Sequence, residues 1–175
     1  THESRLVMYT DALVRAAHGW RFHRRSCQFV GTDGLGDRPA RAVRPGDDEA
    51  AILRTLTEYC FTCDDGRFDA LAECFTEDAT LVAPGERVEG RAAIVAWYVG
   101  AQGTPKQRGK HLTTNVQCDL DGDRATVVAD FAWLRFTSQG KLVPGTTGRY
   151  VDEMERSGDR WRFHRREIQL LRAPE

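Results

Sequence analysis

The chain has 175 residues, of which 41% are hydrophobic and 29% charged, enough for one globular domain with a core and too few for a second complete domain. Its 25 basic and 26 acidic side chains leave a formal net charge of −1, which gives no electrostatic reason to expect nucleic acid or an anionic membrane as a partner. No apolar stretch approaches the roughly 18 residues of a membrane span and no signal peptide is recognisable, so we expect a soluble, cytoplasmic protein.

The beginning of the chain is repeated near its end. Residues 8–30 match residues 149–171 at a constant offset of 141, and ten of the 23 positions are identical, including the hexapeptide Trp-Arg-Phe-His-Arg-Arg. Each copy alternates like two strands joined by a polar turn, which predicts two antiparallel β-hairpins. The basic runs at 21–25 and 162–166 alternate with Phe and His, as exposed strand faces do.

A hairpin alone cannot bury a face, so the first copy needs an explanation. We favour residues 1–30 being the last hairpin of a truncated, preceding copy of the same domain, in a tandem repeat. The alternative is a strand pair added to the complete domain or to a second subunit. Residues 31–47 are rich in glycine, proline and charge, which predicts a linker.

The complete domain is predicted from residue 48 onward. From Asp48 to Cys63 apolar residues recur every three or four positions after an acidic start, which indicates a helix. A second, short helix is predicted over 67–75, a short strand over 79–82, and a third helix after Gly90.

After Lys110 the apolar period changes to two. Four strands are predicted over 111–120, 125–137, 147–156 and 161–171, with turns rich in Gly, Asp and Ser between them. Helices followed by a long antiparallel meander predict an α+β fold in which one curved sheet wraps around the first helix. Such an arrangement leaves a blind internal pocket between sheet and helices.

Four motifs in this part of the chain resemble a known family: Tyr59-x4-Asp64-x2-Arg67-Phe68-Asp69-Ala70-Leu71-x3-Phe75-Thr76-Glu77-Asp78-Ala79, Gly90-Arg91-x2-Ile94, His111-x3-Asn115 followed by Asp121-Gly122-Asp123-Arg124-Ala125, and Gly148-Arg149-Tyr150-x-Asp152-x3-Arg156-x4-Trp161. Over about residues 48–172 the chain resembles SnoaL-like domains of the nuclear transport factor 2-like superfamily, in the scytalone dehydratase-like branch. The resemblance implies a cone-shaped, curved antiparallel sheet wrapped around helices, the cystatin-like roll. It leaves the function open, because this fold hosts isomerases, lyases, hydrolases, cyclases and non-catalytic binders.

The resemblance also implies an acid and a histidine that face one another. Asp64 ends the first predicted helix, where dehydratase-like members carry an inward-facing acid; the alternative is a helix-end cap, with Asp65 facing water. His111 matches the histidine across the cavity in these relatives; the alternative is a polar residue at the start of a strand. A carboxylate that fixes the tautomer of a histidine makes an acid/base pair.

Five further residues are candidates for contact with a substrate: Tyr59, Trp97, Tyr98, Asn115 and Trp133. Aromatic residues at such spacings are more often simply core. The chain also departs from scytalone dehydratase, because Cys63 replaces the tyrosine before the acid and the segment 143–148 lacks the second histidine. The repetition of Tyr150, Asp152, Arg156 and Trp161 in both hairpins indicates a structural role, with a tryptophan plug and a cross-strand Asp–Arg pair.

The cysteine pattern and the absence of cofactor motifs argue against a bound metal or nucleotide. Five cysteines are an odd number and too few for a disulfide framework, so we expect free thiols, and we interpret the C-x-x-C pair Cys60 and Cys63 as small core residues. No dinucleotide fingerprint, phosphate-binding loop or serine-nucleophile motif is present. Any enzyme here is expected to work without a cofactor.

Two functions therefore stay open. The first is a cofactor-independent lyase or isomerase that moves a proton on a small, mostly apolar substrate, with Asp64 and His111 as the acid/base pair. The second is a non-catalytic small-molecule-binding or dimerisation module, including a small subunit like those of aromatic-ring dioxygenases. The resemblance also implies a homodimer through the outer sheet face, for which Phe131, Trp133 and Phe136 offer apolar surface.

Overall fold

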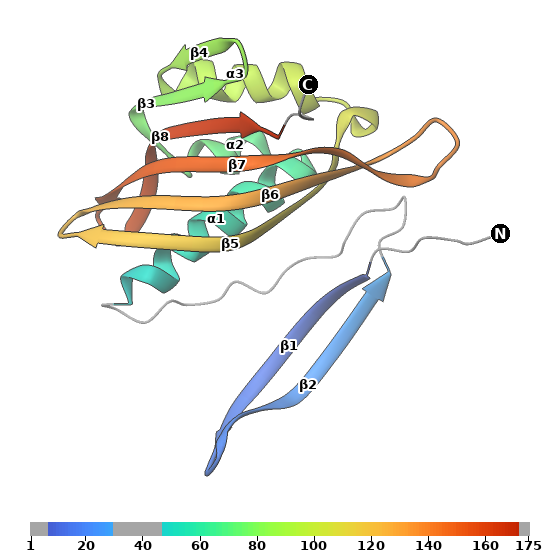
Figure 1. Cartoon of the computed structure of the whole chain (residues 1–175), viewed down its shortest axis with the longest axis vertical. Coiled ribbons are helices and arrows are strands. Elements are labelled where there is room, and N and C mark those ends of the chain that lie inside the picture. Colours follow the sequence, from blue (N-terminus) through green and yellow to red (C-terminus); the bar gives the residue numbers. More distant parts are fainter. Residues whose placement is uncertain (1–6, 30–46, 172–175) are drawn as a thin grey trace. The chain divides into compact units, whose positions relative to one another are not determined.

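The structure is a computed structural model that describes residues 7–29 and 47–171, which belong to two compact units (Figure 1). The first unit contains the predicted hairpin, formed by β1 (Val7–Ala16) and β2 (Gly19–Phe29) as a two-stranded antiparallel sheet. The predicted linker at 31–47 lies outside the described residues, except for its last residue. Among the described residues, no helix is long and apolar enough to cross a lipid bilayer.

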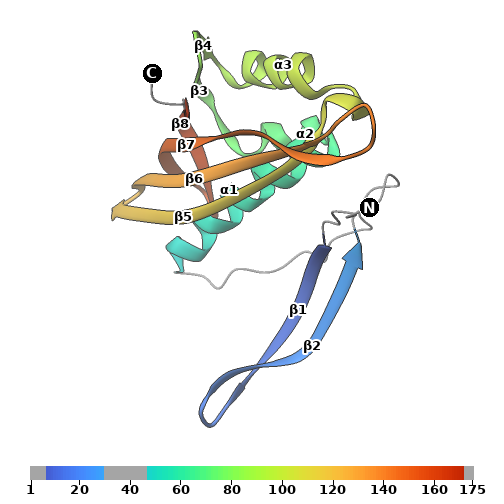
Figure 2. The ribbon, with the colours of Figure 1, turned by 45° about the vertical axis from the view of Figure 1, so that its right-hand side comes forward.

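The second unit has the predicted α+β architecture with a curved sheet (Figure 1). Its elements are α1 (Asp48–Asp65), α2 (Phe68–Ala72), β3 (Phe75–Ala83), β4 (Glu86–Glu89), α3 (Arg91–Gln102), the short 3-10 helix η1 (Pro105–Gln107), β5 (Gly109–Asp121), β6 (Arg124–Phe136), β7 (Leu142–Ser157) and β8 (Arg160–Leu170). The strand order is β4-β3-β8-β7-β6-β5. Figure 2 shows α1 along β5 to β7 and α3 at the end of the sheet formed by β3 and β4.

The sheet differs from the predicted antiparallel meander at one end. β3 pairs with β8 in parallel, and β4 adds an edge strand that the sequence did not predict. Three of the four residues of β4 are charged, so it carries no apolar alternation from which a strand could be recognised.

Capping groups determine where α1 begins and ends. The Asp47 carboxylate accepts a hydrogen bond from the Ala50 N–H at 3.2 Å, which satisfies one of the unpaired donors of the first turn. At the other end Gly66 adopts the left-handed conformation, with φ of 70°, and its N–H donates to the Cys63 carbonyl at 3.1 Å. Because glycine adopts this conformation without a Cβ clash, the helix stops there and Asp64 lies in its last turn.

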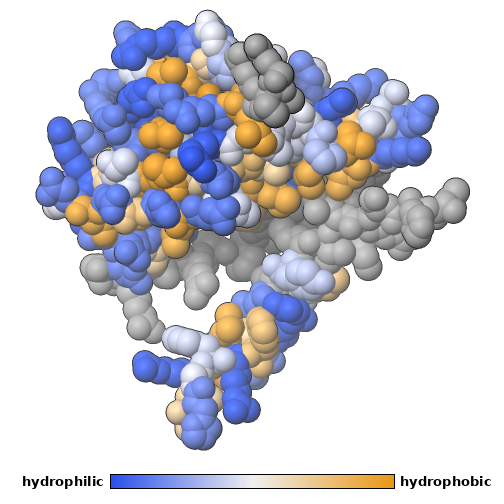
Figure 3. Space-filling model, viewed as in Figure 1, coloured by the Kyte–Doolittle hydropathy of each residue, from blue (hydrophilic) through white to orange (hydrophobic). Residues whose placement is uncertain are grey.

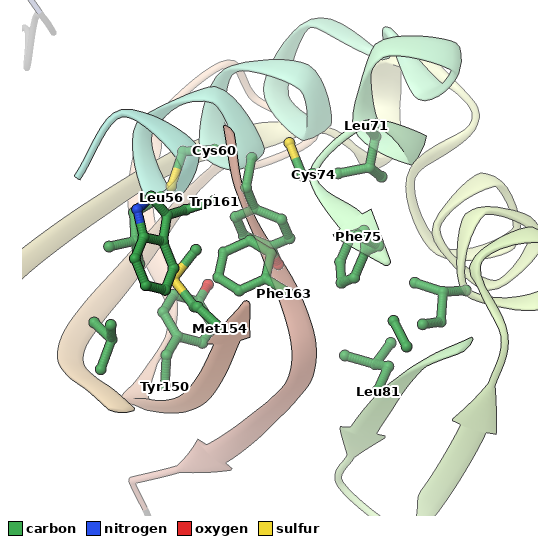
Figure 4. Packing of buried hydrophobic residues seen from close by; sticks show 14 of the residues in the cluster. Leu56, Cys60, Leu71, Cys74, Phe75, Leu81, Tyr150, Met154, Trp161 and Phe163 are labelled. Carbon is green, nitrogen blue, oxygen red and sulfur yellow. The ribbon is translucent and has the colours of Figure 1, made fainter. Parts of the chain in front are cut away.

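The core forms between α1 and the inner face of the sheet. In Figure 4 Leu56 and Cys60 of α1 lie over Trp161, Met154 and Tyr150 of the β7–β8 hairpin. The same close-up shows the cluster continuing from Phe163 to Phe75, Leu71 and Leu81. Cys60 and Cys63 are buried free thiols within this cluster, so their interpretation as core residues is confirmed.

The predicted cross-strand Asp–Arg pair exists, but its arginine is Arg166 on β8. Arg166 donates two hydrogen bonds to the Asp152 carboxylate, at 2.9 and 2.8 Å, and both side chains are completely buried. Interpreting the run 162–166 as an exposed face is therefore wrong, because Phe163 and Arg166 are buried and the other three residues are half-buried. A bulge on β8 next to His164 shifts the alternation by one position, which turns Arg166 inward.

Only one of the three residues proposed for an outer dimer surface lies exposed. Phe131 is part of the core and Trp133 is half-buried on the same inner face, whereas Phe136 is exposed. Phe131 and Trp133 share one face of β6, as strand alternation requires, and this is the face that packs on the helices.

Asp48 connects the start of α1 with the β7–β8 hairpin. Its carboxylate lies 2.7 Å from Nη2 of Arg156 and accepts a hydrogen bond from the Trp161 indole N–H at 3.1 Å. The Arg156 hydrogen bond and then that of Trp161 lower the pKa of Asp48 from its ordinary value. A folded-state pKa below the unfolded one means that Asp48 stabilises the fold above about pH 4 and that this contribution is lost as the pH falls through the folded pKa.

We therefore expect Asp48→Asn to unfold at a lower urea concentration than the wild type at pH 7, with the difference shrinking toward about pH 2. Asparagine cannot pair ionically with Arg156, whereas the wild-type carboxylate loses its own charge only in acid. Urea midpoints of both proteins at the two pH values measure the effect. A difference of the same size at both values would contradict it.

Candidate functional site

Asp64 and His111 meet at an edge of the six-stranded sheet. Asp64 lies in the last turn of α1, and His111 lies near the start of β5, the edge strand. Nδ1 of His111 is 2.6 Å from Oδ1 of Asp64, and only 6% and 2% of the two side chains are exposed. Two residues 47 positions apart are thus in hydrogen-bond contact inside the fold.

The backbone of β5 also holds the Asp64 carboxylate. Outward N–H groups of an edge strand have no neighbouring strand to bind, and here the His111 N–H donates to the two carboxylate oxygens at 3.2 and 3.3 Å. Nζ of Lys110 lies 3.0 Å from Oδ2. An imidazole, a backbone amide and an ammonium group therefore surround the carboxylate, which fixes its orientation and compensates its charge.

The contact at Nδ1 determines which nitrogen of His111 is available for chemistry. A carboxylate accepts hydrogen bonds, so Nδ1 carries the proton, and Nε2 is then the basic nitrogen of the neutral ring. No hydrogen bond from the described ranges, 7–29 and 47–171, engages Nε2. The geometry suits a general base whose tautomer is held by an acid.

Tyr59 links this pair to the aromatic core. Its ring lies 6.2 Å from the His111 ring and 5.8 Å from the Tyr98 ring, and the two tyrosine hydroxyls share a hydrogen bond of 2.9 Å. Burial raises the pKa of both phenols. Both tyrosines therefore stay neutral at physiological pH, with Tyr59 next to the imidazole and Tyr98 next to Tyr59.

Trp133 lies across from His111 on the neighbouring strand, with ring centroids 6.4 Å apart. Two glycines leave room for its indole, because a Cβ added to Gly109 would lie 2.6 Å from Nε1 and a Cβ added to Gly145 would lie 2.5 Å from Cε3. The indole N–H is buried and has no hydrogen-bond partner within the part of the chain that the structure describes. An unpartnered buried donor is costly unless a ligand supplies an acceptor.

Filling the space at Gly145 should displace the indole. We expect Gly145→Ala to lower the free energy of unfolding by about 1–3 kcal/mol, because the new methyl group overlaps the Trp133 ring. Gly100→Ala is the matched control, since nothing lies within 4 Å of a Cβ added there and alanine is the better helix former. Urea unfolding compares the two variants. A Gly145→Ala protein as stable as Gly100→Ala would show that Trp133 does not need the space beside Gly145.

The other two predicted lining residues have different surroundings. Trp97 donates its indole N–H to Glu86 of β4 at 2.8 Å and packs edge-on against Tyr98. Asn115 is exposed at a bulge of β5 with φ of 52°, and its amide donates to Asp130 at 2.9 Å. The structure thus places the rings of Tyr59 and Trp133 next to His111, with Tyr98 against Tyr59, and leaves Asn115 on the outer face.

Sequence reasoning missed the basic residue at this site. Lys110 precedes His111, and strict alternation along a strand would place the two on opposite faces. No pattern in the sequence indicates that both reach Asp64, because that depends on the end of α1 lying beside an edge strand. The described residues contain no group of three or more His, Cys, Asp and Glu side chains that could hold a metal ion.

The fold defines a class. A curved mixed sheet packed on helices is the architecture of a nuclear transport factor 2-like domain with a cystatin-like fold. Residues 45–167 match the SnoaL-like domain. The chain belongs to the SnoaL-like family, and both the resemblance and the fold class predicted from the sequence are confirmed.

Solved structures agree with this assignment. Rv3472, a protein of unknown function from Mycobacterium tuberculosis, has a TM-score of 0.68 and 27% identity over 72% of this chain and 77% of that one. A candidate scytalone dehydratase from Novosphingobium aromaticivorans has a TM-score of 0.64 and 26% identity over 71% and 85%. An NTF2-like protein with a cystatin-like fold from the same species has a TM-score of 0.67 and 26% identity over 73% and 84%. No curated protein matches the chain.

Proposed function

We propose that this protein is a cofactor-independent lyase or isomerase that moves a proton on a small, mostly apolar substrate. His111 is the acid/base, and Asp64 positions it. The observation that carries the proposal is the 2.6 Å contact between Nδ1 of His111 and Asp64, which leaves Nε2 as the basic nitrogen. Membership of the SnoaL-like family and similarity to a candidate scytalone dehydratase support it.

One imidazole can supply both proton transfers of an elimination. Nε2 of His111 takes a proton from a carbon next to a carbonyl, and the electrons of that C–H bond form a C=C bond as the C–O bond on the adjacent carbon breaks. The imidazolium then gives its proton to the departing hydroxyl, which leaves as water. In an isomerisation the same proton returns to a different carbon.

The neighbouring groups have defined parts in this scheme. The Asp64 carboxylate stabilises the imidazolium that forms after proton abstraction. The unpartnered indole N–H of Trp133 is the donor that we assign to the substrate carbonyl, where negative charge develops in the transition state. The rings of Tyr59 and Tyr98 provide the apolar surroundings.

A proton-exchange screen in D2O tests the proposal. Small apolar ketones, β-hydroxy ketones and β,γ-unsaturated ketones are incubated with the full chain, and proton NMR follows loss of the α C–H signal, elimination of water or migration of the double bond. His111→Ala is compared with His164→Ala, whose ring nitrogen lies 3.7 Å from Asp78, away from Asp64. Catalysis by the wild type and His164→Ala but not by His111→Ala supports the proposal, whereas the same rates for all three proteins contradict it.

The alternative function is a small-molecule-binding module without turnover. It is favoured by one observation, that the hydroxyls of Tyr59 and Tyr98 bind one another and so are less available to hold a reacting substrate. This alternative predicts saturable binding of apolar ligands, measured by calorimetry, with the same affinity in the wild type and His111→Ala and with no chemical change of the ligand.

A further inference from the structure

The β1–β2 hairpin repeats the β7–β8 hairpin in three dimensions as well as in sequence. Strand pairing shifts at the same place in both, with His23 as the extra residue in one and His164 in the other. In the first hairpin Arg25 donates two hydrogen bonds to Asp11, at 2.7 and 2.8 Å, as Arg166 does to Asp152 in the second. The two hairpins are therefore the same structural unit.

The aromatic contacts of the arginine are repeated too. The Arg25 guanidinium carbon lies 4.8 Å from the Tyr9 ring centroid and 4.1 Å from that of Phe22. Its counterpart Arg166 lies 4.1 and 4.0 Å from the rings of Tyr150 and Phe163. In the second hairpin Tyr59 of α1 adds a third ring at 3.9 Å.

The residues kept in both copies concentrate on the inner face. Five of the seven inner positions are identical, namely Tyr9, Asp11, Trp20, Phe22 and Arg25 with their partners Tyr150, Asp152, Trp161, Phe163 and Arg166, while Leu13 and Cys27 stand for Met154 and Ile168. In the second copy α1 covers this face, β6 pairs with β7 and β3 pairs with β8. Because these inner-face residues are retained, the first hairpin has a face suited to the same neighbours, a helix like α1 and strands like β6 and β3.

The side chains on that face are exposed in the first hairpin. Trp20 is 62% exposed and Phe22 57%, whereas Trp161 and Phe163 are 1% and 0% exposed. Figure 3 shows hydrophobic side chains on this unit among hydrophilic ones. An exposed aromatic face on a strand pair with two open edges has strong physical reason to bind a complementary body.

We propose that one face of the first hairpin binds the body of another SnoaL-like domain, meaning its helices and the rest of its sheet. This first-hairpin face consists of Tyr9, Leu13, Trp20 and Phe22. The body supplies a helix like α1 over the face, a strand like β6 antiparallel to β1 and a strand like β3 parallel to β2. The body within this chain already carries β7 and β8 in that place, so the occupant is a further body of the same kind. This surface is independent of the proposed catalytic site.

The full chain provides such a body once its own second hairpin is disabled. Trp161→Ser with Phe163→Ser removes the two rings that β8 contributes beneath the helices. We expect the first hairpin to take the place of the second, within one molecule or between two, so that urea unfolding stays cooperative. Hydrogen exchange of the β1–β2 amides should slow by at least about tenfold relative to the wild type, because these strands become part of a folded sheet.

Two further variants separate the face from the rest of the hairpin. Adding Trp20→Ser and Phe22→Ser should abolish both the cooperative unfolding and the slowed exchange. The matched control adds Arg21→Ser and Arg24→Ser, which lie outside the first-hairpin face, and should preserve both. The proposal is overturned if the Trp161→Ser, Phe163→Ser protein does not unfold cooperatively, or if removing Trp20 and Phe22 from it changes neither measurement.

Discussion

Asparagine in place of Asp64 should lower the rate of proton transfer by about 10²–10⁴-fold, the usual contribution of a positioned acid/base group. The amide has no charge with which to stabilise the imidazolium of His111. It can also donate its N–H to Nδ1, which moves the ring proton to Nε2 and removes the base. The rate is measured with the substrate identified in the D2O screen.

Asp65→Asn is the matched control for this variant. Asp65 is the next residue of α1, and its carboxylate lies 3.7 Å from Nε of Arg67, so the same chemical change is made one position away. Nitrogen-15 NMR of histidine-labelled protein should show the Nδ1–H tautomer of His111 in the wild type and in Asp65→Asn, and its loss in Asp64→Asn. An Asp64→Asn protein with wild-type turnover would exclude the positioning role.

Alanine in place of Asp152 should cost about 3–5 kcal/mol of unfolding free energy, the range found when one partner of a buried ion pair is removed. Although burial opposes its charge, Arg166 has a pKa held well above its ordinary value by the adjacent Asp152. Without the carboxylate, a guanidinium remains buried among the rings of Tyr59, Tyr150 and Phe163. Urea unfolding at pH 7 measures the loss.

The repeat supplies the control for this prediction. Asp11→Ala removes the same carboxylate from the same arginine geometry in the first hairpin, where the pair is exposed to water. Solvent there compensates the freed charge, so we expect no measurable change in the urea midpoint. Equal losses in the two variants would show that burial does not determine the strength of this pair.

Most of the fold follows from periodicity. The three- and four-residue spacing of α1 and the alternation of β5 to β8 express backbone geometry, so their existence could be predicted from local sequence. The parallel β3–β8 pair could not, because its partners are far apart in the chain and parallel pairing leaves no local pattern. β4 was missed because it is short and charged.

The candidate site was only partly predictable. Asp64 and His111 were selected because the motifs that contain them resemble those of a known family in order and spacing. Their contact, and the arrival of Lys110 at the same carboxylate, depend on the end of α1 lying against the outer edge of β5. Asn115 was proposed to line the pocket, but it lies exposed at a bulge that interrupts the alternation of β5.

The two hairpins separate what the sequence determines from what tertiary structure decides. The same residues produce the same strands, the same bulge and the same Asp–Arg pair in both copies, because each of these features arises from contacts within the hairpin. Burial is different. Trp161 is covered and its counterpart Trp20 is exposed, because burial requires a helix from elsewhere in a fold to lie on the face, and no local pattern can supply it.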